Sequence, residues 1–259
     1  MILAAGLGTR LRPLTNDRPK ALVEVAGRTL LELTLARLRC FGISDVIINT
    51  HHFAEMVEEY LAAHKNFGMH IEVSHEDVLL DTGGGLKRAQ HFFAGSDEPF
   101  LVHNVDVLSM IDFGSMLRFH LEKSALATLA IQDRPTSRYL LFDRNRQLCG
   151  RRAGLTGIPE FVCPCEDYEA RAFCGVHVFS PRIFSAIKDE GVFSIIPSYL
   201  ELAAGRERIF GFPSDGYYWR DLGKPRHIAE AGREIAAGIY PLEAPQMRLE
   251  NPGQSAENQ

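Results

Sequence analysis

The sequence has little of what nucleic-acid-binding and membrane proteins need. Its 28 Lys and Arg are outnumbered by 33 Asp and Glu, giving a formal net charge of −5, whereas general nucleic-acid binding requires a basic surface that neutralises many phosphates. No apolar run approaches the roughly 18 residues of a membrane span, and no signal-peptide core precedes the first glycines. We therefore expect a cytoplasmic protein that binds neither nucleic acid nor membranes, and in which any basic site is local.

Cysteine is also scarce. The five cysteines are Cys40, Cys149, Cys163, Cys165 and Cys174. An odd number suits reduced thiols better than a disulfide framework. Cys163 and Cys165 could form half of a zinc site, but zinc sites usually space their cysteines more widely and need a second pair, which is absent. The sequence therefore favours thiols without disulfides or metal, and leaves the role of this pair open.

Internal repeats are absent, including the hexapeptide repeats that build a parallel β-helix. A second catalytic domain is therefore not expected. The length of 259 residues suits one elaborated domain. We expect this domain to cover residues 1–240 and a polar, Pro-containing tail to cover residues 241–259.

The first half of the chain alternates short apolar strands with amphipathic helices. The expected strands cover 1–3, 45–49, 70–74, 100–103 and 126–131. The expected helices cover 29–41, 54–64, 85–93 and 113–123. This alternation predicts an α/β fold, Rossmann-like, with three α/β/α layers around a mixed and mostly parallel central sheet.

After residue 139 the pattern loosens. The expected elements there are strands at 139–142, 172–179 and 208–212 and helices at 181–189, 195–204 and 225–237. A stretch with Gly, Pro and Arg and little period separates the first two strands. We interpret this half as a smaller β elaboration of the sheet on the substrate side.

The segment AAGLGTRLRPLTNDRPKAL, residues 4–22, has no clear helical or strand period. A G-x-G-x-x-G dinucleotide fingerprint fails because Leu11 stands where the third glycine would be. The glycines let backbone N–H groups approach a ligand closely, and four basic residues offer positive charge to phosphate oxygens. These are Arg10, Arg12, Arg18 and Lys20. On these residues alone, the alternative is a solvated basic loop.

Three other segments combine polar residues with glycines or strand ends. Asp106 follows an apolar strand in VHNVDV, at the edge where open α/β sheets bind ligands, although a helix cap or turn is the alternative. The glycines of LDTGGGL, residues 80–86, open a helix and would let the backbone pass under a flat base or ribose, or form a plain helix-entry turn. The segment YWRDLG contains Asp221, and core packing is favoured for its Trp219.

The segment GLGTRLRPLTNDRPKAL resembles the signature of the sugar-1-phosphate nucleotidyltransferases, G-x-G-T-R-x-x-P-x-T-x-x-x-P-K-x-L. The matched positions are Gly6, Gly8, Thr9, Arg10, Pro13, Thr15, Pro19, Lys20 and Leu22. The resemblance implies that the loop wraps a nucleoside triphosphate. It also implies that Arg10 contacts the reacting phosphates and that Lys20 reaches the α-phosphate or the sugar phosphate. Arg12 and Arg18 are then peripheral.

The same resemblance assigns roles to further residues. Asp106, in place of the family's N-G-D aspartate, and Asp221, in a segment similar to W-x-D-x-G, are implied to hold Mg²⁺. With Arg10 and Lys20 they form the implied catalytic set. The implied nucleotide-binding residues are Ala4, Ala5, Gly6, Gly8, Thr9, Arg10, Glu76, Gly83, Gly84 and Gly85. The implied sugar-binding residues are Asn104, Gly175 and Glu169, with Glu160 as an alternative to Glu169. Val105 departs from the family's glycine at that position.

The resemblance implies transfer of a nucleoside monophosphate from a nucleoside triphosphate to a sugar 1-phosphate, which releases pyrophosphate. The nucleotide-binding half would cover about 1–110 and the sugar-binding half about 111–240. The short chain looks most similar to compact mannose-1-phosphate guanylyltransferases and N-acetylmuramate 1-phosphate uridylyltransferases, so base and sugar stay open. A monomer or small homo-oligomer is expected. The alternative is a catalytically silent regulatory or scaffold paralogue, which would be free to lose its charged residues.

Overall fold

The computed structural model describes residues 1–242, and in them a ten-stranded mixed sheet forms the centre of the fold. The main path of the sheet is, in spatial order, β11 (Glu160–Phe161), β10 (Leu148–Ala153), β9 (Arg138–Asp143), β12 (Tyr168–Phe179), β6 (Phe100–Asn104), β1 (Ile2–Leu3), β4 (Asp45–Thr50) and β5 (His70–His75). Two strands lie off this path: β8 (Ala127–Gln132) pairs with β12, and β13 (Ile209–Pro213) pairs with β8.

The direction of the strands divides the sheet into two parts. Strands β6, β1, β4 and β5 are mutually parallel, so their carboxyl ends meet at one edge. Strand β12 runs antiparallel to β6, β8 and β9, and the outer strands continue antiparallel. The predicted mixed α/β sheet is therefore confirmed, with four parallel strands from the first half of the chain and a second half that is mostly antiparallel, apart from β13, which runs parallel to β8.

Two small ribbons supplement the sheet. They are β2 (Glu24–Val25) with β3 (Arg28–Thr29), and β7 (Val107–Ser109) with β14 (Trp219–Asp221). The α-helices are α1 (Leu30–Cys40), α2 (Ala54–Ala63), α3 (Asp81–Arg88), α4 (Phe113–Glu122), α5 (Ile183–Ala186), α6 (Ile195–Ala204) and α7 (Pro225–Ala236). Short 3₁₀-helices cover Thr9–Leu11, Lys20–Leu22, Lys65–Gly68 and Ala89–Phe93. None of the helices in residues 1–242 is long and apolar enough to cross a membrane.

Alternating side chains of the sheet face two core clusters, one on each face. Val46 and Ile48 of β4 pack with α1, α2 and α4, whereas Ile47 between them packs with α3, α5 and α6. Period-two alternation along a strand buried on both faces produces this division. The three predicted layers are therefore helices, sheet and helices.

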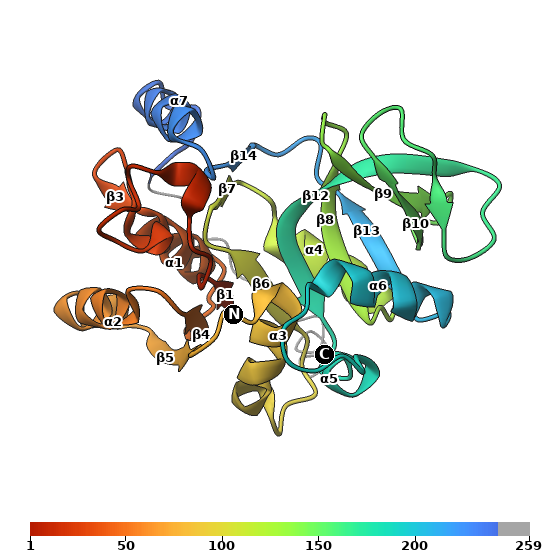
Figure 1. The fold of residues 1–259 in the computed structure, drawn as a ribbon, viewed down its shortest axis with the longest axis horizontal. Coiled ribbons are helices and arrows are strands. Elements are labelled where there is room, and N and C mark those ends of the chain that lie inside the picture. The colour runs from red at the N-terminus through yellow and green to blue at the C-terminus, as the bar shows by residue number, and fades with distance from the viewer. Residues whose placement is uncertain (243–259) are drawn as a thin grey trace, which may run out of the picture.

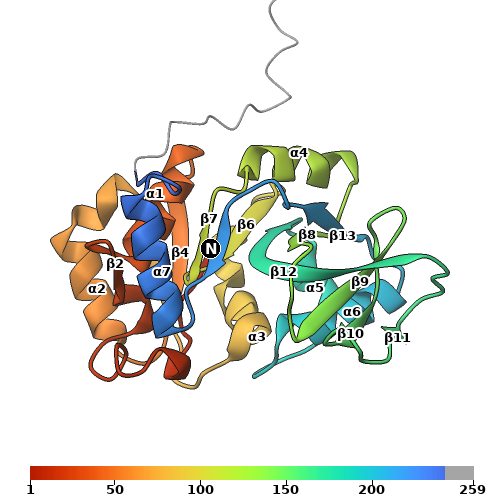
Figure 2. The ribbon, with the colours of Figure 1, turned by 90° about the horizontal axis from the view of Figure 1, so that it is seen from above.

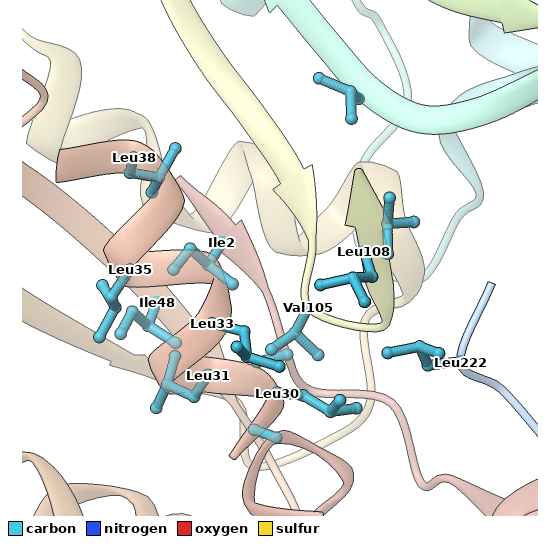
Figure 3. Packing of buried hydrophobic residues seen from close by; sticks show 14 of the residues in the cluster. Ile2, Leu30, Leu31, Leu33, Leu35, Leu38, Ile48, Val105, Leu108 and Leu222 are labelled. Atoms are coloured by element: carbon cyan, nitrogen blue, oxygen red, sulfur yellow. The ribbon is translucent and has the colours of Figure 1, made fainter. Parts of the chain in front are cut away.

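The aspartate-bearing segments are anchored in the first of these clusters. Val105, Leu108 and Leu222 pack there with Ile2 and the leucines of α1 (Figure 3). Val105 is 3% exposed and Leu222 is 1% exposed. The side chain of Val105, which replaces the family's glycine, therefore lies in the core.

The last helix returns to the first half of the molecule. Figures 1 and 2 show α7 (blue) beside the N-terminal elements (red), away from the green and teal strands of the second half. Ala231 and Ile235 of α7 join the core cluster that contains α1. A C-terminal segment thus covers the part of the molecule that the first residues build.

Most expected elements occur within a few residues of their predicted bounds, and three predictions were wrong. The helix expected at 85–93 begins at Asp81 and ends at Arg88, because the glycines lie inside its first turns rather than before it. The helix expected at 181–189 is reduced to Ile183–Ala186, since Ile187 is extended. The third error is an omission, since strands β2, β3, β7, β10, β11 and β14 were not predicted. Of the expected tail, residues 243–259 lie outside the described residues.

Candidate active site

Asp106 and Asp221 lie side by side at the carboxyl edge of the parallel strands. Asp106 directly precedes β7, and Asp221 is the last residue of β14, where it lies opposite Val107. The amide of Leu222 donates to the carbonyl of Asp106 at 2.7 Å. The β7–β14 ribbon therefore brings the backbones of two aspartates that are far apart in the sequence next to each other.

The carboxylate of Asp221 is oriented by the turn that follows it. Its Oδ1 accepts a hydrogen bond from the amide of Gly223 at 2.7 Å. A Cβ at Gly223 would lie 2.8 Å from that oxygen and 2.9 Å from Nη2 of Arg10. A side chain here would therefore displace both groups from these positions, and Arg10 approaches Asp221 across this glycine.

The loop over residues 4–22 reaches the aspartates through Lys20. The Lys20 ammonium contacts the Asp106 carboxylate, and the two side chains are 13% and 15% exposed. Desolvation strengthens this ion pair relative to one on the surface. Lys20 therefore neutralises one of the two carboxylates directly.

The glycine turn of the same loop is fixed from inside. Gly8 has a φ of 63°, and a Cβ there would lie 2.9 Å from Cγ2 of Thr15. The Thr15 hydroxyl donates to the Gly8 carbonyl at 2.8 Å. At the strand end, the buried Ala4 donates its amide to Oδ1 of Asn49 at 2.7 Å. Gly6, Thr9 and Arg10 remain exposed on the outside of this turn.

Arg12 and Arg18 lie apart from this constellation. Both are exposed, and Arg18 donates to the carboxylate of its neighbour Asp17 at 3.1 Å. Nothing in residues 1–242 joins either side chain to the aspartates by a hydrogen bond or an ion pair. The structure therefore separates Arg10 and Lys20 from the other two arginines of the loop.

The three glycines of α3 pack against protein atoms. A Cβ at Gly83 would lie 2.2 Å from the Phe193 ring, and one at Gly84 would lie 2.2 Å from the Gly191 carbonyl oxygen. The amides of Gly83 and Gly84 both donate to the Phe193 carbonyl, at 3.0 and 3.2 Å. These glycines thus allow the segment before α6 to cover the start of α3 and to accept its otherwise unpaired N–H groups.

Glu76 is buried among the same groups, with 1% of its surface exposed. Its carboxylate accepts from Nδ2 of Asn49 at 2.7 Å and from the amide of Leu80 at 2.9 Å. A Cβ at Gly85 would lie 2.7 Å from its Oε1. Both oxygens of Glu76 are therefore engaged within the protein, which suits a residue that fixes the start of α3.

On the other side of the aspartates, Gly175 and Asn104 lie in contact. Gly175 has a φ of 74°, and a Cβ there would lie 2.9 Å from Nδ2 of Asn104 and from Val107. Asn104 Oδ1 is buried and has no hydrogen-bond partner among the described residues. Glu169 lies at the start of the same strand, exposed and ion-paired with Arg171 at 2.8 Å. The alternative Glu160 lies on the edge strand β11, paired with Arg151.

Trp219 packs partly against the core, as predicted, and also contacts two polar groups. Its indole N–H donates to the carbonyl of Cys174 at 2.8 Å, and the Arg134 guanidinium lies 3.7 Å from its ring centroid. Neither Arg134 nor Asn49 was selected from the sequence, because a lone arginine after a strand or a lone asparagine within one carries no local signal. The five cysteines form no disulfide, as predicted.

The carboxylates of Asp106 and Asp221 suit a hard cation that takes only a few of its ligands from the protein. Within residues 1–242, no group of three or more His, Cys, Asp or Glu side chains converges on a possible metal position. Two carboxylates beside a glycine-rich basic loop nevertheless suit Mg²⁺, which commonly takes one or two carboxylates and completes its shell with substrate phosphates and water. Asp106 and Asp221 are the residues that would hold it.

Comparison with known proteins supports the α/β fold described above. The family model described as "Nucleotidyl transferase" matches residues 1–238. An N-acetylmuramate alpha-1-phosphate uridylyltransferase from Caulobacter vibrioides is 35% identical over 91% of this chain and 96% of its own length. A mannose-1-phosphate guanyltransferase from Yarrowia lipolytica is 31% identical over 87% of this chain, which spans 61% of that protein.

A solved structure shares the fold at lower identity. The crystal structure of HddC from Yersinia pseudotuberculosis superposes with a TM-score of 0.73 at 20% identity, covering 90% of this chain and 97% of HddC. At this identity the likeness concerns the architecture alone.

Proposed function

Since this chain belongs to the nucleotidyl transferase family, we propose that it transfers a nucleoside monophosphate from a nucleoside triphosphate to a sugar 1-phosphate with the help of Mg²⁺. The family and the named relatives make it a sugar-1-phosphate nucleotidyltransferase. The observation that supports the proposed mechanism is the convergence of four residues at one edge of the sheet, namely Asp106, Asp221, Lys20 and Arg10. The products would be a nucleoside diphosphate sugar and pyrophosphate.

The reaction needs no protein nucleophile. An anionic oxygen of the sugar phosphate attacks the α-phosphorus, the new O–P bond forms, and the bond to the bridging oxygen of pyrophosphate breaks in line. The obstacle is the approach of several negative charges, so positioning and charge compensation supply the catalysis. When bound at Asp106 and Asp221, Mg²⁺ would act as a Lewis acid and as a template for the phosphate oxygens.

Different residues of the chain would bind different parts of the substrates. The backbone around Gly6, Gly8 and Thr9 would line the triphosphate, because the exposed turn presents N–H groups without obstructing side chains. Arg10 would compensate charge on the phosphates that leave. Lys20 would exchange its contact with Asp106 for one with the α-phosphate or the sugar phosphate.

The two flanks of the aspartates would hold the rest of each substrate. Ala4 and Ala5 follow β1 next to Asn49, and with α3 they would form the nucleotide side. There we assign Gly83, Gly84, Gly85 and Glu76 to positioning rather than to direct contact. Asn104 and Gly175 would form the sugar side, since the side-chain amide of Asn104 lies against Gly175 and its Oδ1 is buried without a hydrogen-bond partner among the described residues. Glu169 would contact the sugar only after its ion pair with Arg171 opens.

The test is release of pyrophosphate from UTP, GTP, dTTP, CTP and ATP, each with a panel of sugar 1-phosphates, with and without Mg²⁺. We expect one triphosphate and one sugar to support turnover that EDTA abolishes. A thermal-shift screen with the same triphosphates would identify the base independently, because a ligand that binds only the native state raises its stability. Triphosphate binding without turnover across the whole panel would instead favour the scaffold alternative.

A further inference from the structure

Arg134 lies at the same sheet edge as the candidate site. It follows β8, whose last residue Gln132 lies opposite Ala172 of β12. Strand β12 runs antiparallel to β6, with Val176 opposite His103. This end of β8 therefore lies at the carboxyl end of β6, on the side of Gly175 rather than that of the triphosphate loop.

The guanidinium of Arg134 is held in a fixed plane. It stacks on the Trp219 ring at 3.7 Å and donates from Nη2 to the Phe173 carbonyl at 2.7 Å. Trp219 stands two positions before Asp221, and Phe173 stands two positions before Gly175. Arg134 is therefore fixed between the strand that carries the second aspartate and the strand that carries the glycine of the sugar side.

Besides Trp219 and Phe173, this guanidinium contacts the Cys174 thiol, which stays neutral because burial raises its pKa to about 11 and so does not balance the charge. No carboxylate of residues 1–242 pairs with Arg134, whereas Arg171 on β12 is paired with Glu169 at 2.8 Å and Asp215 at 3.6 Å. The Nε of Arg134 is buried and has no hydrogen-bond partner in the described chain. An incompletely paired, partly buried cation is costly unless an anion completes it. A stacked guanidinium presents its remaining donors as a rigid fork that matches a planar carboxylate.

We propose that Arg134 determines sugar specificity by binding a carboxylate carried by the sugar of the sugar 1-phosphate. This inference rests on the proposed function of the site. Substrates of this class are sugars with an acidic substituent, such as N-acetylmuramate 1-phosphate with its lactyl ether. The 1-phosphate itself is a second oxyanion that the same cation could take, and the experiment separates the two.

The test uses two substrates that differ only in the lactyl ether, N-acetylmuramate 1-phosphate and N-acetylglucosamine 1-phosphate. The nucleotide in both assays is the triphosphate that supports pyrophosphate release in the screen. We expect Arg134→Met to raise KM for the acidic sugar by about 100-fold, the usual scale for removing one partner of a charged hydrogen-bonded pair, with kcat nearly unchanged. For the neutral sugar, kcat/KM should stay within about threefold, and Arg134→Lys should restore part of the binding of the acidic sugar.

The matched control is Arg144→Met, an exposed arginine in the turn between β9 and β10, which should leave both substrates unaffected. An equal rise in KM for both sugars would assign Arg134 to the 1-phosphate and overturn the inference. A fall in kcat for both, together with a lowered Tm, would assign it to holding Trp219 and would also overturn it. Wild-type turnover of neutral sugars alone would reject the inference and leave the proposed function intact, and no turnover at all would reject both.

Discussion

The ammonium group of Lys20 contacts the carboxylate of Asp106, 86 positions further along the chain. The loop that would hold the triphosphate is thereby tied to the aspartate that would hold the cation. The other aspartate, Asp221, has its own amide donor in Gly223. The two carboxylates thus differ in their surroundings, since one is neutralised by an ammonium and the other is held by a backbone N–H.

Asp106→Asn should lower kcat by more than about 100-fold, because removing one preorganised charge contact commonly costs around 3 kcal/mol of transition-state stabilisation. Pyrophosphate release at saturating substrates measures it. Asp17→Asn is the control, since this carboxylate lies in the same loop, is mostly exposed and contacts only Arg18 among the groups described here. A kcat for Asp106→Asn within tenfold of the wild type would remove this residue from the catalytic set.

Lys20→Met should separate cation binding from turnover. The variant loses the positive charge that competes with a cation for Asp106, so the Kd for Mg²⁺, measured by calorimetry without substrates, should fall severalfold. Turnover should nevertheless drop by more than about 100-fold, because the ammonium no longer compensates phosphate charge. Arg12→Met, an exposed change in the same loop, should alter neither quantity. Weaker Mg²⁺ binding in Lys20→Met would show that the ion pair supports the site rather than competing with the cation.

Gly84→Ala should destabilise the fold by about 1–3 kcal/mol, the usual cost of overpacking. Its Cβ would lie 2.2 Å from the Gly191 carbonyl oxygen, a backbone atom that cannot move aside. Gly232→Ala is the matched control in α7, where a Cβ meets nothing within 4 Å. It should stabilise the protein by about 0.5–1 kcal/mol, because alanine favours helix more than glycine does. Urea unfolding midpoints at constant m-value decide the matter, and equal effects of the two changes would refute the packing role of Gly84.

Three buried histidines should make the protein less stable in mild acid. Burial lowers the pKa of His103 and of His120 to about 4, and that of His177 to about 3. As the pH falls below about 6.5, these histidines therefore become protonated in the unfolded chain, whereas in the folded chain they stay neutral until a lower pH. Stability is full above that pH, and it falls by about 1.4 kcal/mol per pH unit for each histidine as the pH drops toward 4.

His120→Gln tests this dependence at one position. The ring nitrogens of His120 lie 2.9 Å from Oγ1 of Thr128 and 3.0 Å from Oγ of Ser180, and an amide can replace part of this pairing. Urea unfolding at pH 7, 6 and 5 should give a shallower loss of stability than in the wild type. His64→Gln, a change at an exposed position, should leave the wild-type slope between pH 7 and 5 nearly intact. An unchanged slope in His120→Gln would show that this histidine is already protonated in the fold.

Local chemistry made part of the fold predictable. The amphipathic pattern over residues 29–41 predicted α1, and in the structure the Thr29 hydroxyl begins this helix by accepting a hydrogen bond from the amide of Glu32 at 3.1 Å. The signature in the loop over residues 4–22 singled out Lys20 and Arg10, and the structure places both beside the aspartates. Such features depend on residues close together in the chain, which is why patterns reveal them.

Other parts of the site depend on contacts between distant segments. Strands β7 and β14 are each three residues long and too short to show a period, yet their pairing brings Asp106 and Asp221 together. The glycines of α3 were interpreted as nucleotide-binding, with a helix-entry turn as the alternative, because nothing in their neighbourhood in the sequence reveals the Phe193 segment that packs on them. Arg134 was equally invisible, since its significance comes from the face of Trp219 and the absence of a carboxylate in the described structure around it.

The pairing of β7 with β14 also sets the moment at which the protein can become active during its synthesis. A nascent chain that has emerged as far as α6 already contains the triphosphate loop, Lys20 and Asp106, but not the strand that carries Asp221. Ribosome-bound chains arrested before residue 219 should therefore fold most of the central sheet and remain silent toward both substrates. Activity would begin only when β14 docks against β7.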